Sequence, residues 1–166
     1  MIKNINKDKR ALSPVIATVI LISVTIVVAV SVAYWMGSIA TGYTSFEQIE
    51  LPTTYAEWKS SMFTTGGWNV TIELKNTGSA DATLNNVFIN SEPLKNIGSG
   101  LCKLYDDSGE ITDLSTISVK IARGNSVTVV ISLKEDYTEG FTAGTRIDIK
   151  LHTAGGKDYP TSIKLP

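Results

Sequence analysis

No charged side chain occurs between residues 11 and 46, and this feature constrains the chain more than any other. Its main part, residues 12–36, is apolar apart from scattered serine and threonine residues. As an α-helix this part would be roughly 37 Å long, which exceeds the hydrocarbon core of a bilayer at about 30 Å. The segment therefore predicts one long N-terminal helix that can span a membrane.

A short basic leader stands directly before this segment. Residues 1–10 carry a net charge of +3, and Lys9 and Arg10 adjoin the apolar run without a spacer. Positive residues beside a hydrophobic span keep that side cytoplasmic, so the C-terminal region is expected to face outward. Ser13 is the expected N-cap, and Pro14 fits the first helical turn. The predicted organisation is a leader over 1–11, a helix and stalk over 12–51, and a head domain over 52–166.

The apolar segment has two other interpretations. Ser38-Ile39-Ala40 offers a small-x-small site for an ordinary secretory signal, but the apolar run exceeds the usual 7–15 residues of such signals. A plain membrane anchor is the second alternative. Small residues are spread around the helix, which lets neighbours approach on several sides: Ala17, Thr18, Ser23, Thr25, Ala29, Ser31, Ala33 and Gly37. Periodicity alone does not choose between lipid and other helices.

The segment RALSPVIATVILI, which begins at Arg10, resembles the N-terminus of the archaeal type IV pilins. The resemblance implies that a prepilin peptidase removes the leader between Ala11 and Leu12, or as second choice between Arg10 and Ala11. It also implies that assembly machinery moves the helix from the membrane into a filament core. The residues expected in that core are Pro14, Ile16, Ile20, Ser23, Val27, Ala29 and Ala33. Counted from Leu12, Ile16 stands where bacterial type IV pilins carry a glutamate.

Beyond the stalk, apolar and polar residues alternate with a period of two, as in half-buried strands. Seven strands are expected, at 68–74, 83–89, 101–105, 117–121, 127–133, 147–151 and 159–165. Residues 53–63 are ambiguous between strand and turn. The predicted fold class is α+β: a long hydrophobic helix followed by an antiparallel, immunoglobulin-like β-sandwich head. The predicted core includes Trp68, Val70, Ile72, Val129, Ile131, Ile147 and Ile149.

The residues that usually carry catalysis are scarce in this chain. His152 is the only histidine and is expected on the polar face of a strand, while Cys102 is the only cysteine and is expected to be a small buried residue. No transition-metal site, cofactor or enzymatic activity is predicted from such a set. Residues 106–110 are acidic enough to hold calcium but are better explained as a surface turn. The net charge of −1, with scattered lysines, gives no reason to expect nucleic acid as a partner.

Asn69-Val70-Thr71 is the only N-glycosylation acceptor in the sequence. Strand alternation places Asn69 on the face opposite Trp68 and Val70, so an N-linked glycan would project into water. An unmodified polar strand face is the alternative.

Together these patterns predict a structural subunit of an extracellular archaeal type IV pilus-like filament, which serves surface adhesion. Its partners would be copies of itself in a helical homopolymer, the peptidase and assembly machinery, and the cell membrane before assembly. The element Ser13-Pro14-Val15-Ile16 favours a pilin over an archaellin, the subunit of a rotating filament. A monomeric, membrane-anchored extracellular binding domain is the alternative from another class.

Overall fold

The computed structural model describes residues 8–98, 100–136 and 141–166. The chain forms two compact units that divide after Thr44. The first contains helix α1 (Asp8–Thr44), which is 37 residues long. The second is the head, which begins at Ser45.

Helix α1 begins earlier than the sequence analysis expected. It runs through Pro14, which therefore lies inside the helix rather than in its first turn, and Ser13 is not its N-cap. In the interior of a helix, proline removes its own N–H from the hydrogen-bond ladder, and its ring crowds the carbonyl four residues earlier, here that of Arg10. Residues 8–13 nevertheless continue the helix before Pro14, so α1 includes residues 8–11 of the predicted leader.

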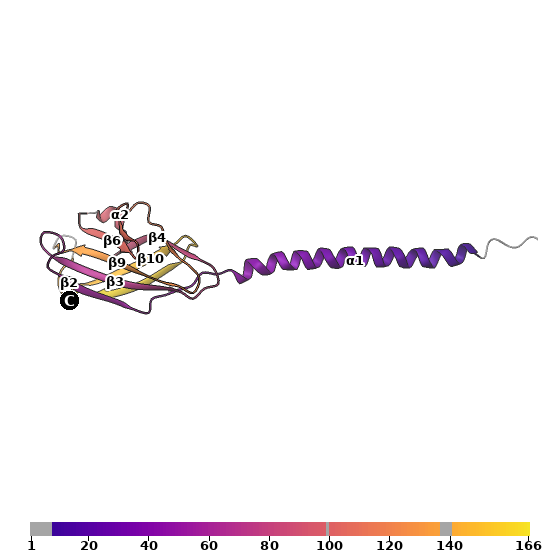
Figure 1. Ribbon diagram of the computed structural model, residues 1–166, viewed down its shortest axis with the longest axis horizontal. Helices are drawn as coiled ribbons and strands as arrows, with labels where there is room; N and C mark the ends of the chain where they lie inside the picture. Colours follow the sequence, from indigo (N-terminus) through magenta and orange to yellow (C-terminus); the bar gives the residue numbers. More distant parts are fainter. Residues whose placement is uncertain (1–7, 99, 137–140) are drawn as a thin grey trace, which may run out of the picture. The chain divides into compact units, whose positions relative to one another are not determined.

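The head contains two antiparallel sheets (Figure 1). The six-stranded sheet comprises β1 (Ile49–Glu50), β2 (Thr54–Lys59), β3 (Gly67–Asn76), β6 (Cys102–Asp106), β7 (Gly109–Ile111) and β9 (Ser126–Lys134). The five-stranded sheet comprises β4 (Ala82–Ile89), β5 (Glu92–Pro93), β8 (Val119–Ile121), β10 (Arg146–Thr153) and β11 (Asp158–Lys164). A short helix, α2 (Leu94–Ile97), follows β5. This arrangement confirms the predicted α+β class with an antiparallel two-sheet head.

Both sheets contribute to one hydrophobic core. All seven predicted core residues are buried, with exposed fractions of 0–1 %: Trp68, Val70, Ile72, Val129, Ile131, Ile147 and Ile149. The longest pairing joins β3 to β9, where Val70 lies opposite Ile131 and Ile72 opposite Val129. The indole N–H of Trp68 donates to the carbonyl of Pro166 at 3.2 Å, which satisfies the polar group of this buried side chain.

The head starts earlier than residue 52, where the sequence analysis placed it. Ile49 is 5 % exposed and belongs to the core, and β1 pairs with the end of β3. Residues 45–51 are therefore part of the head and do not form a separate stalk. The alternation signal misses them because β1 is only two residues long.

Candidate functional site

The surface of α1 is the main functional candidate, because its apolar side chains have no partner within the described chain. Every described side chain from Pro14 to Thr44 is exposed. Large residues such as Leu21 and Val27 are 67 % and 64 % exposed. The 31 residues Pro14–Thr44 are apolar enough by length and composition to cross a membrane. A helix that is apolar all round requires lipid or other helices around it.

Several serine and threonine hydroxyls on this helix have hydrogen-bond partners within it. The hydroxyls of Ser23, Thr25 and Ser31 donate to backbone carbonyls one turn earlier, at 2.7–2.9 Å. Thr18 and Thr41 do the same with carbonyls three residues earlier, both at 2.8 Å. These hydroxyl groups therefore need no hydrogen-bond partner from a neighbouring molecule.

The residues predicted for a filament core occupy more than one face of α1. Ile16, Ile20, Ser23 and Val27 recur at intervals of four and three, so they form one stripe. At 3.6 residues per turn, Ala29 lies about 150° around the helix axis from this stripe and Ala33 about 110°. The helix can therefore offer packing positions to neighbours in several directions at once.

The predicted cleavage region lies at the start of α1. The backbone of Arg10, Ala11 and Leu12 is helical, whereas residues 1–7 of the leader lie outside the described residues. In a chain that starts at Leu12, Pro14 would be the third residue. Its missing N–H would then fall among the first-turn donors that have no intrahelical partner in any helix.

Asn69 lies on the outer face of the six-stranded sheet, as predicted. It is half-buried between Glu57 of β2 and Ser132 of β9, its two cross-strand neighbours. The Ser132 hydroxyl donates to its side-chain oxygen at 2.8 Å. The amide nitrogen, which a glycan would modify, is the other end of the same side chain.

His152 belongs to a small charged cluster on the outer face of the other sheet. Its Nδ1 lies 2.5 Å from a carboxylate oxygen of Asp158, and the ammonium of Lys150 lies 3.3 Å from the other oxygen. These two partners, His152 first, hold the pKa of Asp158 below its ordinary value of 3.8. His152 therefore lies on the polar face of its strand, as the sequence analysis expected, and it also contacts Asp158 on the neighbouring strand.

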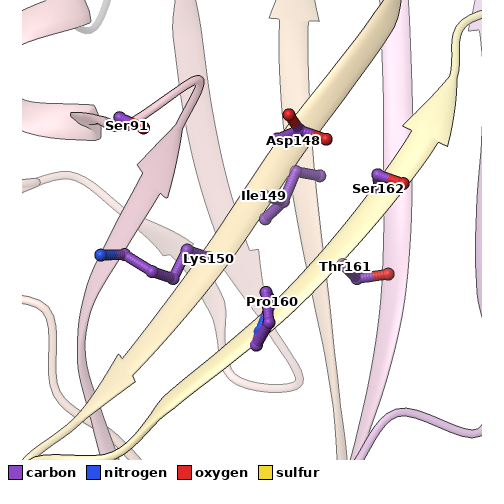
Figure 2. Close-up of a pocket in the computed structure, with 7 residues that line it drawn as sticks. All are labelled: Ser91, Asp148, Ile149, Lys150, Pro160, Thr161 and Ser162. Atoms are coloured by element: carbon purple, nitrogen blue, oxygen red, sulfur yellow. The ribbon is translucent and has the colours of Figure 1, made fainter.

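A surface hollow lies beside this cluster on β10 and β11 (Figure 2). It is lined by Ser91, Asp148, Ile149, Lys150, Pro160, Thr161 and Ser162. The side chain of Lys150 extends toward β4, where its ammonium lies 4.6 Å from the centre of the Phe88 ring. Its charge is therefore engaged by Phe88 and Asp158, both within the head.

The remaining candidates also have structural explanations. Asp106 accepts hydrogen bonds from the backbone of Ser108 and Gly109, at 2.8 and 3.0 Å, as in an ordinary turn. Cys102 is fully buried as expected, and desolvation raises the pKa of its thiol to about 11. Among the described residues, no group of three or more histidine, cysteine, aspartate or glutamate side chains is placed to hold a metal ion.

Sequence reasoning missed one set of contacts in the head. Residues 46–48, called the neck segment here, are hydrogen-bonded to the turn after β3 and to the hairpin between β10 and β11. The available signal was Glu47, the first charged residue after the uncharged run.

No protein-family model matches the chain, and no curated protein matches its sequence. The solved structures that match the chain include two that show only weak likeness to it. The subunit of the archaeal flagellum of Methanospirillum hungatei strain JF1 is 13 % identical with a TM-score of 0.41, over 94 % of this chain and 92 % of that one. The Iho670 flagellar-like filament subunit is 12 % identical with a TM-score of 0.41, over 92 % of this chain and 98 % of that one. Both likenesses are weak, and they leave the function to be inferred from the chain's own residues.

Proposed function

We propose that this chain is a non-catalytic structural subunit of an archaeal type IV pilus-like filament on the cell surface. The observation that carries the proposal is the part of α1 from Pro14 to Thr44, which has no charged side chain and is exposed around its whole circumference. In the precursor the membrane would cover this surface. In the filament, helices of other copies would replace the lipid, and the heads would form the outer wall.

Processing is the first step of this proposal. A prepilin peptidase would remove the leader, so that the mature chain begins at Leu12 or, as second choice, at Ala11. Assembly machinery would then extract the helix from the membrane. The basic pair Lys9-Arg10 beside the apolar run supports this order, because the positive leader stays on the cytoplasmic side.

Surface adhesion is the role proposed for the assembled filament, and Asn69 is the proposed site of an N-linked glycan on its head. The outer-face position of Asn69 supports glycan attachment. Mass spectrometry of the peptide that contains Asn69, compared with the same peptide from an Asn69→Gln variant, tests this modification. An unmodified mass in the native protein would count against it.

Electron microscopy of sheared cell-surface material tests the main proposal. Helical filaments that contain this subunit are expected. Recovery of the protein only from the membrane fraction would instead support a monomeric anchored binding domain. Loss of swimming on deletion of the gene, with attachment unchanged, would favour an archaellin over a pilin.

A further inference from the structure

The neck segment is held first by the turn that joins β3 to β4. The Phe46 carbonyl accepts hydrogen bonds from the backbone N–H groups of Ser79 and Ala80, at 2.9 and 3.1 Å. The Phe46 N–H donates to the Ser79 hydroxyl oxygen at 3.0 Å, and Thr77 N–H donates to the Gln48 carbonyl at 2.8 Å. This turn connects a strand of one sheet to a strand of the other.

The hairpin between β10 and β11 holds the same segment through Glu47. The Thr153 hydroxyl donates to the Glu47 carboxylate, and the Lys157 ammonium donates to the Glu47 carbonyl at 2.6 Å. Thr153 is fully buried, so its hydroxyl needs a partner inside the head. The neck segment is therefore bound by side chains as well as by backbone groups.

Two glycines make room for this arrangement. A Cβ on Gly78 would lie 2.5 Å from the Phe46 carbonyl oxygen and 2.6 Å from the Gln48 nitrogen, both backbone atoms. A Cβ on Gly155 would lie 2.5 Å from the Glu47 carboxyl carbon. Neither glycine has a positive φ. The close approach of the neck backbone therefore requires glycine at position 78, whereas at position 155 the end of the Glu47 side chain would have to move.

We propose that these contacts form a force-transmitting clasp, which passes tension on α1 into both sheets of the head at once. The inference rests on the proposed filament function, because only an assembled or extracted subunit experiences such tension. Without the clasp, the pull would enter through β1, a two-residue strand that unzips readily from the end of β3. With it, the pull is shared by hydrogen bonds to the β3–β4 turn and to the β10–β11 hairpin.

Single-molecule pulling on the full chain in detergent micelles tests the clasp. The force is applied between the C-terminus and an introduced cysteine that carries the second handle. This cysteine is Gly42→Cys, which precedes the neck segment, or Thr53→Cys, which follows it. Buried Cys102 does not compete for labelling, because its thiol pKa of about 11 keeps it protonated at neutral pH. Gly78→Ala is expected to lower the unfolding force from the Gly42→Cys handle and to leave it unchanged from the Thr53→Cys handle. Gly100→Ala, where a Cβ meets nothing within 4 Å, is the matched control.

Amide hydrogen exchange gives an independent readout. Gly78→Ala should speed the exchange of Thr77, Ser79 and Ala80 by about tenfold or more, as overpacking against backbone does. Lys157→Met removes the hydrogen bond to the Glu47 carbonyl and keeps an unbranched apolar side chain. It should speed the exchange of the same three amides by about fivefold, and it replaces Gly78→Ala as the test variant if that protein does not fold.

The clasp would be refuted by equal force changes from the two handles, or by no change from either handle. Unaltered exchange of the three amides in both variants would also refute it. Absence of filaments from the wild-type chain would count against the proposed function. It would not change what the pulling and exchange experiments say about the neck contacts.

Discussion

Ile149 and Lys150 are chain neighbours whose surroundings differ completely. Ile149 is 1 % exposed in the core, whereas Lys150 lies on the outer face with Asp158 and Phe88. In a strand, successive side chains point to opposite faces, so two adjacent truncations compare the core directly with the surface.

Ile149→Ala is expected to destabilise the head by about 2–5 kcal/mol, because it leaves a cavity in the core. Lys150→Ala removes an exposed ion pair and should cost about 1 kcal/mol or less. Denaturant unfolding of a soluble fragment over residues 45–166 measures both. A larger loss for Lys150→Ala would mean that the side chains of β10 face the opposite way.

Asp158 should make the stability of the head depend on pH in the acid range. Its partners lower the folded-state pKa below the ordinary 3.8, so the ionised form is favoured in the folded head. The resulting stabilisation is present above pH 3.8 and is lost as the pH falls through the folded-state pKa. Chemical unfolding of wild type and Asp158→Asn at a series of pH values should show a difference that disappears in acid. A difference that grows in acid would contradict this assignment.

At the scale of elements, α1 and the head depend on different interactions. The head has its own core, while α1 contributes an exposed apolar surface within the chain. A change in α1 is therefore expected to affect assembly and to leave the head folded.

Ala29→Arg or Ala33→Arg should abolish filament formation. A guanidinium at the centre of an apolar helix costs about 2.5–3.5 kcal/mol in a bilayer, and a packed bundle of helices would leave it without a partner. Electron microscopy shows whether filaments form. Circular dichroism of the 45–166 fragment gives the spectrum of the folded head, with which the spectra of the variants are compared. Tyr43→Arg, near the end of α1, is the control, because a long side chain there can reach water. Normal filaments from Ala29→Arg and Ala33→Arg would show that α1 does not form the core.

The sequence predicted the elements with strong periodicity and missed the short ones. All seven expected strands are present, because each alternates around residues of one buried core. β2 was ambiguous because Trp58, in the inward-facing phase, lies at the edge of the core and is 42 % exposed. The neck contacts could not be predicted, because they join residues 29 to 110 positions apart without any periodic pattern.

At the scale of the whole molecule, the parts of the chain have different proposed roles. The leader is removed during processing, α1 spans the membrane and then enters the filament core, and the head forms the outer wall. The boundary between α1 and the head coincides with a change in amino-acid composition. The uncharged run ends at Phe46, only two residues beyond the end of α1.

The mature protein should begin at Leu12, or at Ala11 as the second choice. The basic pair directly before the apolar helix motivates this prediction. Intact-mass measurement and N-terminal sequencing of protein from the cell surface provide the test. A start at Thr41 would instead show cleavage by a secretory signal peptidase and would remove α1 from the mature subunit.

The internal hydrogen bonds of the α1 hydroxyls have a consequence for exchange between filament and membrane. Since Thr18, Ser23, Thr25 and Ser31 keep their own carbonyl partners in either place, neither environment gains or loses a hydrogen bond when the helix moves. The difference between the two environments then reduces to the fit of side chains against lipid or against protein. In the proposed filament, a subunit that moved between the bilayer and the helix bundle would keep these four hydrogen bonds.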